Sequence, residues 1–193
     1  MKIVGISGTN GSGKDTVGKI LQDEYGFLFV SVTDILRNEL IKRGQTPERE
    51  YLRELSAEWR RKDGLGILID KAIKIYESKD NQYNGLVVSS LRNAGEADRV
   101  HELGGKVVWV DANPEIRYKR ISGRGRGAED DKTYEEFLGE EQDEMKSSGD
   151  ETTIAVVEVK KLCDIFLENN TEDINIFKAD INNSLQNFLD GID

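Results

Sequence analysis

The feature of this chain that most restricts its fold is a glycine-rich segment near residue 10. The segment reads Gly8-Thr9-Asn10-Gly11-Ser12-Gly13-Lys14. It follows the apolar, β-branched run 3–6 and leads into residues 13–24, which have the spacing of a helix. Because glycine adopts backbone conformations closed to other residues, such a segment can turn a strand sharply into a helix. The order of strand, glycine turn and helix predicts an α/β fold.

Four more short apolar runs recur along the chain, at 27–30, 86–88, 107–110 and 164–167. Each is rich in β-branched or aromatic residues, and polar segments of helical type separate them. This alternation predicts a five-stranded parallel sheet, buried on both faces, with helices on either side. We therefore expect an α/β three-layer sandwich, and the length of 193 residues favours a single domain over 1–193.

Two segments are longer than a plain connection between strands requires. Residues 33–84 look helical throughout, and Pro47 is placed to begin a new helix. Residues 122–153 open with alternating glycines and arginines at 123–127, which indicates a mobile, cationic loop. The acidic run that follows, from Glu129 to Glu141, is expected to form solvated helix faces.

Composition narrows the range of functions. The formal net charge of −10 argues against binding to nucleic acid or an anionic membrane, so an anionic ligand would need a local group of cations. The single Cys163 excludes a disulfide framework, and the single His101, expected on a helix surface, leaves no basis for histidine metal sites or triads. Without a signal-peptide pattern or an apolar stretch of membrane-spanning length, a cytoplasmic protein is expected. Oligomeric state has no signal in the sequence.

The glycine-rich segment has the spacing of a P-loop, with Gly8 and Gly13 at its ends and Lys14 directly after. In a P-loop, backbone N–H groups point at phosphate oxygens, and the positive end of the following helix attracts the same charge. Lys14 would reach the β- and γ-phosphates. Residues 8–14 are therefore predicted to bind ATP.

The position after the lysine departs from the usual P-loop pattern. A serine or threonine normally stands there and binds Mg²⁺ through its hydroxyl, whereas this chain has Asp15 followed by Thr16. Asp15 could bind the metal directly or through water, or Thr16 could supply the hydroxyl. Asp15 could also do no more than favour the positive start of the helix. We predict Mg²⁺ as a cofactor, with Asp15 and Thr16 as candidate ligands.

Arginines that follow the second and third predicted strands indicate a second anion site. Asp34 and Arg37 come after the second strand, and Arg92 comes after the third, at the carboxyl edge where open α/β sheets bind ligands. Asp34 is expected to cap the helix that it begins. Arg37 and Arg92 are predicted to bind a phosphate of an acceptor substrate, because the planar guanidinium binds phosphate in two places. A surface salt bridge is the alternative for Arg37.

A third group of arginines precedes and enters the loop at 123–127. Its members are Arg117, Arg120, Arg124 and Arg126. Arg120 and Arg124 are four positions apart and would share a helix face. On a loop that closes over ATP, they and Arg126 would stabilise the transferring phosphoryl group. Arg117 is expected to be an ordinary surface cation.

These motifs resemble the nucleoside monophosphate kinases, adenylate kinase included. The resemblance rests on the P-loop, Asp34-Ile-Leu-Arg37, Leu91-Arg92-Asn93 and Arg120-Ile-Ser-Gly-Arg124. The Gly-Lys-Asp-Thr variant is similar to that of viral deoxynucleoside monophosphate kinases and animal phosphomevalonate kinase. Residues 91–141 are also similar to archaeal nucleotide-kinase-like proteins related to dephospho-CoA kinase. Together the matches extend over about 2–170.

The resemblance implies the strand order usual for P-loop kinases, an acceptor-binding helical insert at 33–84 and a lid at 122–153. It also implies that Arg120 lies against the base of ATP, that Arg124 touches phosphates, and that the loop containing Asn170 packs beside adenine. Two departures separate the chain from adenylate kinase. There is no arginine beyond Arg126, and Ser89 and Ser90 stand where an aspartate usually orients the water shell of Mg²⁺.

The expected function is an ATP-dependent transfer of the γ-phosphoryl group to a small phosphorylated acceptor, a nucleoside or deoxynucleoside monophosphate. One alternative is a hydroxyl kinase like dephospho-CoA kinase, in which Asp34 would be the base. The other is a slow ATPase or switch that acts through a partner.

Overall fold

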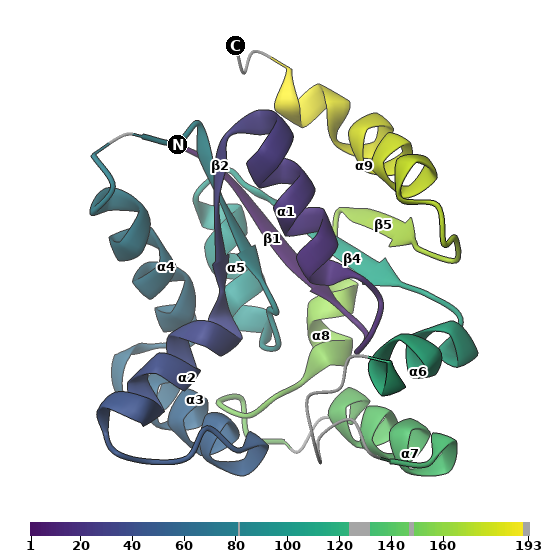
Figure 1. The fold of residues 1–193 in the computed structure, drawn as a ribbon. Helices are drawn as coiled ribbons and strands as arrows, with labels where there is room; N and C mark the ends of the chain where they lie inside the picture. The colour runs from purple at the N-terminus through teal and green to yellow at the C-terminus, as the bar shows by residue number, and fades with distance from the viewer. Residues whose placement is uncertain (81, 124–131, 147–148, 191–193) are drawn as a thin grey trace.

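Five parallel strands form the central sheet of the computed structural model, which describes residues 1–80, 82–123, 132–146 and 149–190. The strands are β1 (Lys2–Gly8), β2 (Phe27–Ser31), β3 (Gly85–Ser89), β4 (Lys106–Asp111) and β5 (Ile165–Glu168). Their order across the sheet is β2-β3-β1-β4-β5 (Figure 1). The predicted five-stranded parallel sheet is therefore confirmed, and β1 lies between β3 and β4.

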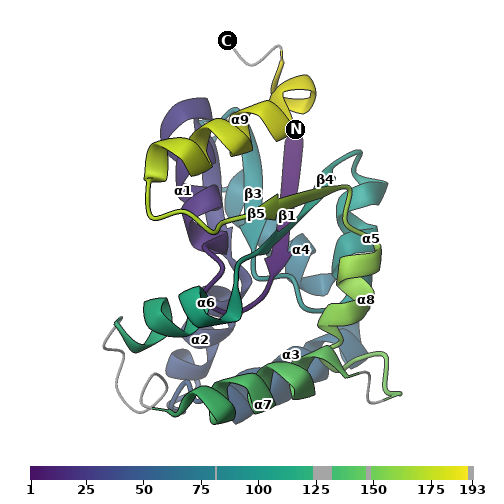
Figure 2. The same ribbon diagram turned by 90° about the vertical axis from the view of Figure 1, so that its right-hand side faces the viewer.

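Helices cover both faces of this sheet (Figure 1). On one face lie α1 (Lys14–Tyr25) and α9 (Ile174–Leu189). The other face and the carboxyl edge carry α2 (Val32–Lys42), α3 (Arg49–Asp63), α4 (Ile67–Glu77), α5 (Ala94–Glu102), α6 (Pro114–Ser122), α7 (Tyr134–Met145) and α8 (Val156–Lys161). Figure 2 shows α3 and α7 below the ends of the strands, in the region toward which the P-loop also turns.

Two hydrophobic cores follow from the alternation of side chains along each strand. Val4 and Ile6 of β1 point to the face covered by α1 and α9, where they pack with Val17 and Phe177. Ile3 points to the opposite face and joins a core with residues of α2, α3, α4, α5 and α8. Because both faces are covered, the central strands are apolar at nearly every position, which is why the sequence shows continuous apolar runs.

The outermost strand differs from the prediction that all strands are buried on both faces. Leu167 of β5 is buried against the α9 side, but Phe166 on the opposite face is 57% exposed. β5 pairs only with β4, so it forms an edge of the sheet. The helices on that side leave Phe166 in contact with solvent.

The segment 33–84 is helical over most of its length, as predicted, and contains three helices, with a new helix beginning soon after Pro47. α2, α3 and α4 are separated by turns at 43–48 and 64–66. Two details of the prediction are wrong. Pro47 precedes Glu48, the N-cap of α3, and so lies outside the helix. Asp34 lies in the first turn of α2, because the chain passes directly from β2 into the helix and Ser31 takes the capping position.

No helix within the described ranges is long and apolar enough to cross a membrane.

Candidate phosphoryl-transfer site

The P-loop curls between β1 and α1 in a conformation that depends on glycine. Gly8, Gly11 and Gly13 have φ angles of 144°, 80° and 100°, in the region that side chains disfavour. A Cβ atom on Gly8 would lie 2.0 Å from the carbonyl oxygen of Val110, and one on Gly13 would lie 2.5 Å from Asn169 Nδ2. Glycine at these positions thus provides both the turn and the space for neighbouring groups.

Neighbouring strand ends hold the P-loop in place. Thr9 Oγ1 donates to Asp111 Oδ1 at 2.7 Å at the end of β4, and Asn169 Nδ2 donates to the Ser12 carbonyl at 2.9 Å after β5. Within the loop, Ser12 Oγ and Lys14 Nζ both donate to the Thr9 carbonyl, at 2.8 and 2.5 Å. The loop is therefore fixed in its curled shape before any ligand binds.

A cavity of about 570 Å³ opens beside the P-loop at the carboxyl edge of the sheet. Its described lining is rich in cations and contains only a few acids. The cations are Lys14, Arg37, Arg49, Arg53, Arg60, Arg92 and Arg120, and the acids are Asp15, Asp34 and Glu144. In a chain with a net charge of −10, this is a local concentration of positive charge of the kind that an anionic ligand requires.

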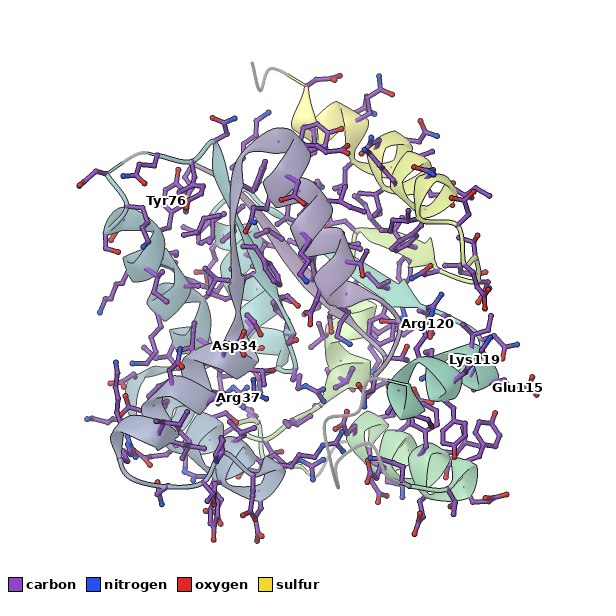
Figure 3. All side chains as sticks on the ribbon, viewed as in Figure 1. Asp34, Arg37, Tyr76, Glu115, Lys119 and Arg120 are labelled. Atoms are coloured by element: carbon purple, nitrogen blue, oxygen red, sulfur yellow. The ribbon has the colours of Figure 1, made fainter. Side chains whose placement is uncertain are left out.

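Most of the residues predicted for the site do line this cavity. They are Asn10, Gly11, Gly13, Lys14, Asp15, Thr16, Asp34, Arg37, Arg92 and Arg120. Figure 3 shows Asp34 and Arg37 on α2 at the left of the view and Arg120 on α6 at the right. Arg124 and Arg126 lie outside the described residues, as do residues 124–131 and 147–148 of the predicted lid at 122–153, whose described part contains α7.

Asn169 and Asn170 have different contacts. Asn169 is buried and holds the P-loop, as described above, while the Asn170 side chain accepts from the Asn113 backbone N–H at 2.7 Å on the outside of the molecule. Asn170 does not contribute to the described lining of the cavity. A position for its loop beside adenine stays a prediction.

Sequence reasoning missed three arginines of the cavity, all on α3. They are Arg49, Arg53 and Arg60. Arg60 is buried, and its guanidinium donates to Glu96 Oε1 at 2.7 Å and to the Thr152 carbonyl at 2.9 Å. The spacing of four and then seven residues places the three side chains on one face of a helix. That spacing was the available signal, but the direction of the face depends on how α3 packs.

Glu144 on α7 contacts two of the cavity's arginines, Arg53 of α3 and Arg92 of the segment after β3. Its carboxylate contacts Arg92 at 2.5 Å and Arg53 at 3.3 Å, and the side chain is 15% exposed. Burial acts to raise the pKa of Glu144, but the charges and hydrogen bond of the arginines outweigh it and hold the pKa below its usual value. The carboxylate is therefore ionised, and Arg53 and Arg92 together bind an anion of the protein itself.

The prediction for Arg117 is wrong, and the prediction of solvated faces for the acidic run holds for the exposed Glu135, Glu136 and Glu140 but fails at Glu141. Arg117 is only 3% exposed, and it donates to the Ala112 carbonyl at 2.7 Å and to Glu141 Oε2 at 3.0 Å. Glu141 accordingly faces a buried guanidinium instead of forming a solvated helix face. The reason is tertiary, because α7 folds back onto α6 and brings the two side chains together. Residues 129–131 of the same acidic run lie outside the described residues.

Arg120, in the last turn of α6, reaches across the loop that follows β5. Its Nη2 donates to the Thr171 carbonyl at 3.0 Å and to Asn169 Oδ1 at 3.4 Å. Nη1 is buried, and no acceptor for it is present among the described residues. Burial lowers the pKa of this guanidinium. The side chain is thus oriented by two contacts where it lines the cavity.

Asp15 is oriented by a residue of a neighbouring strand. Ser89 Oγ, at the buried end of β3, donates to Asp15 Oδ1 at 2.7 Å. Asp15 and Thr16 both line the cavity. A carboxylate and a hydroxyl are hard oxygen donors, which suit Mg²⁺ together with phosphate oxygens and water. The described residues contain no cluster of three or more histidine, cysteine or acidic side chains that could hold a metal alone.

The strand order, the P-loop and the cavity beside it define a P-loop NTPase with a kinase-like fold. Shikimate kinase from Bacteroides thetaiotaomicron has a similar fold, with a TM-score of 0.56 at 13% identity, over 96% of this chain and 97% of that one. Shikimate kinase from Acinetobacter baumannii gives a TM-score of 0.54 at 16% identity, over 96% and 93%. At these identities the likeness concerns the fold alone.

A family model described as an AAA domain matches residues 4–147, and the chain belongs to that family. A UPF0200 protein from Pyrococcus abyssi is 32% identical over 186 residues, which are 93% of this chain and 92% of the relative. Another from Pyrobaculum aerophilum is 25% identical over 183 residues, 94% and 95% of the two chains. The chain is thus a member of the UPF0200 family, and the predicted kinship with P-loop nucleotide-kinase-like proteins is confirmed.

Proposed function

We propose that this protein is an ATP-dependent phosphotransferase that moves the γ-phosphoryl group of ATP-Mg to a small phosphorylated acceptor, a nucleoside or deoxynucleoside monophosphate. The observation that carries the proposal is the shape of one cavity. A P-loop forms one wall and arginines of α2, α3 and the segment after β3 form another. A site built in this way can hold two anions next to each other.

The donor would bind at the P-loop. The backbone N–H groups of the loop and the positive end of α1 attract the phosphates, and Lys14 neutralises charge on the β- and γ-phosphates. Arg120 lines the same cavity and would contribute a positive charge near the donor. Since Thr9 and Asn169 already fix the loop, little reorganisation is needed when ATP binds.

Asp15 and Thr16 are the residues that would hold Mg²⁺, either directly or through water. When bound, Mg²⁺ neutralises charge that develops on the phosphate oxygens. Asp15 lies beside Lys14 and is held by Ser89, so its carboxylate is already oriented within the cavity wall.

The acceptor would bind at the arginines of α2, α3 and the segment after β3 that line the cavity. The contact of Arg53 and Arg92 with Glu144 supports a phosphate subsite there, because a carboxylate bound by two guanidinium groups has the charge and the planar geometry that these groups recognise. Apolar side chains in the same lining, Leu36 and Leu52 among them, would suit a base or another flat apolar group.

Transfer of a phosphoryl group between two phosphates requires positioning more than covalent chemistry by the protein. An acceptor phosphate oxygen is already an anionic nucleophile, so no strong general base is needed. The role of the arginines is to overcome the repulsion between the two substrates and to align the reacting oxygen with the γ-phosphorus.

A hydroxyl acceptor is the second candidate, and one observation favours it. Asp34 lines the cavity, is 61% exposed and is held by Arg37 at 2.7 Å, so a carboxylate is available as a base. Asp34→Asn separates the two candidates. It should abolish turnover by a hydroxyl kinase, whereas it should only weaken acceptor binding in a monophosphate kinase. Initial rates across acceptor concentrations distinguish a loss of kcat from a rise in KM.

The central experiment is an ADP-release assay with ATP-Mg and a panel of acceptors that includes ribonucleoside and deoxynucleoside monophosphates and dephospho-CoA. We expect turnover that depends on one class of acceptor. Lys14→Met should lower kcat by about 10²–10³-fold, since it removes a cation from the transferring phosphate. Lys19→Met, an exposed lysine on the same helix, is the matched control and should leave the rate unchanged. Turnover independent of every acceptor would contradict the proposal and favour an ATPase.

A further inference from the structure

Two departures from the usual P-loop pattern meet in three dimensions. In P-loop NTPases the metal is held by a serine or threonine after the P-loop lysine and by an aspartate of a second motif. Here the residue after Lys14 is Asp15, and β3, the strand paired with β1, ends at Ser89. Ser89 Oγ donates to Asp15 Oδ1 at 2.7 Å. A carboxylate and a hydroxyl are thus both present and in contact. The carboxylate, however, follows the P-loop lysine, where a hydroxyl is usual, and the hydroxyl ends β3, where an aspartate is usual.

Ser89 and Asp15 differ in burial, and this difference indicates different roles. Ser89 is fully buried and does not contribute to the described cavity lining, so it can act only through another residue. Asp15 does line the cavity, next to Lys14 and Thr16. The bond from Ser89 uses one oxygen of the Asp15 carboxylate and leaves Oδ2 out of this contact. A hydrogen bond of this kind orients a metal ligand in many metal sites.

The backbone after β3 provides an independent sign of constraint. Ser90 has a φ of 72°, a left-handed conformation that is costly for a residue with a side chain. This conformation directs the chain away from β3 immediately after Ser89, and Ser90 then lines the cavity. Ser89 and Ser90 hydroxyls lie 3.4 Å apart. The strand end is therefore held in a fixed shape where it contacts Asp15.

Exchanging the carboxylate and the hydroxyl between the two positions leaves the net charge of the pair unchanged. A hydroxyl on the P-loop side with a carboxylate on the strand carries one negative charge and one hydrogen bond, and so does the reverse arrangement. In this chain the carboxylate lies in the first turn of α1, where the positive end of the helix attracts negative charge. The reversed pair thus keeps a hard anionic oxygen donor beside the phosphate-binding loop.

We propose that Asp15 and Ser89 form an exchanged magnesium-binding pair, in which Asp15 is the metal ligand and Ser89 is the positioning residue that orients it. This inference rests on the proposed function, because it assumes that the P-loop binds ATP with Mg²⁺. It also explains why Ser89 stands at the end of β3, where an aspartate is usual: Ser89 is the hydrogen-bond partner of Asp15.

The test compares ATP binding with excess Mg²⁺ and with EDTA by isothermal titration, and follows Mn²⁺ binding to the protein–ATP complex by electron paramagnetic resonance. In Asp15→Asn, the gain in ATP affinity caused by Mg²⁺ should fall by at least about tenfold. Its affinity for ATP in EDTA should be equal or higher, because a negative charge near the phosphates is gone. A variant that has merely lost its fold would lose affinity in both conditions.

The positioning role of Ser89 has its own variants. Ser89→Ala should lower the Mg²⁺-dependent gain by a smaller factor than Asp15→Asn does. The exchange variant, Asp15→Ser with Ser89→Asp, restores the usual arrangement and should bring the gain back to within a few-fold of the original chain. Asp23→Asn, an exposed aspartate on the same helix, is the control and should change nothing. Thermal unfolding without nucleotide checks that each variant folds.

The outcomes separate this inference from the proposed function. If Asp15→Asn keeps the full Mg²⁺-dependent gain, or if Thr16→Val loses it while Asp15→Asn does not, the exchanged pair is wrong and the kinase proposal stands. If Ser89→Ala retains the gain in full, Ser89 has no positioning role. If the original chain does not bind ATP in either condition, the proposed function is wrong and the inference fails with it.

Discussion

Gly13 is the residue at which the P-loop, α1 and the segment after β5 come together. It has a φ of 100°, and a Cβ atom there would lie 2.5 Å from Asn169 Nδ2, the group that donates to the Ser12 carbonyl. The glycine therefore serves two purposes that can be separated. It permits a left-handed backbone, and it leaves space for the amide that holds the loop.

Gly13→Ala should both destabilise the fold and weaken ATP binding by at least about tenfold, because the added methyl group displaces Asn169 from the loop. Gly44→Ala is the control. Gly44 also has a positive φ, of 72°, where α2 ends, but no heavy atom lies within 4 Å of the added Cβ. Both variants should lose about 1–2 kcal/mol from backbone strain, measured by urea denaturation. Equal ATP affinity of the two variants would contradict the proposed role of Asn169.

Helix α7 is attached to the rest of the molecule by two different kinds of contact. On the α6 side, Phe137 is buried and its ring lies 5.9 Å from that of Tyr118. On the side of α3, the contacts are ion pairs, Arg49 with Glu140 at 2.6 Å and Arg53 with Glu144 at 3.3 Å. The contact with α6 depends on the burial of apolar surface. The contact with α3 depends on ion pairs, and one of them uses Arg53, which the proposed acceptor phosphate would also need.

Glu144→Gln should tighten the binding of inorganic phosphate and of the acceptor by roughly tenfold, because Arg53 and Arg92 no longer bind an internal carboxylate. Titration of each variant with phosphate at low ionic strength measures the effect. Glu135→Gln, an exposed position on the same helix, should leave the affinity unchanged. Weaker phosphate binding in Glu144→Gln would mean that the carboxylate supports the arginines and does not compete with the ligand.

At the scale of the whole molecule, the charge distribution is uneven. The chain carries a net charge of −10, yet the cavity lining is rich in cations. Many acidic groups are held by specific partners. The hydrogen bond from Lys178 holds the pKa of Glu24 below its usual value, and ion pairs do the same for Glu140 and Glu144, although burial acts in the opposite direction. Folding thus favours the ionised form of these carboxyl groups.

Stability should consequently be lost in acid. A carboxyl group with a lowered pKa in the folded state contributes stability above its unfolded pKa of about 4.3, and this contribution is lost as the pH falls through the folded value. We expect the free energy of unfolding, measured with urea, to be nearly constant from pH 7 to about pH 5 and then to fall. Glu24→Gln should show a smaller fall. Stability that rises below pH 5 would instead mean that repulsion among the excess negative charges dominates.

The sequence determined the elements of this protein because the signals are local. The five apolar runs became β1 to β5, and the glycine spacing at 8–14 became a P-loop, since backbone preference and side-chain periodicity act within a few residues of each other. Arg92 and Arg37 could be assigned to the cavity because parallel strands all end at one edge of the sheet.

What only the tertiary structure decided were the contacts between side chains of distant elements. Three contacts each join residues that are 24 or more positions apart: Arg117 with Glu141, Arg53 and Arg92 with Glu144, and Ser89 with Asp15. Such contacts depend on the angles and distances at which helices pack on the sheet, and no local pattern specifies them. The P-loop and its place at the edge of the sheet could therefore be predicted from the sequence, while the arrangement of charged side chains around the cavity could not.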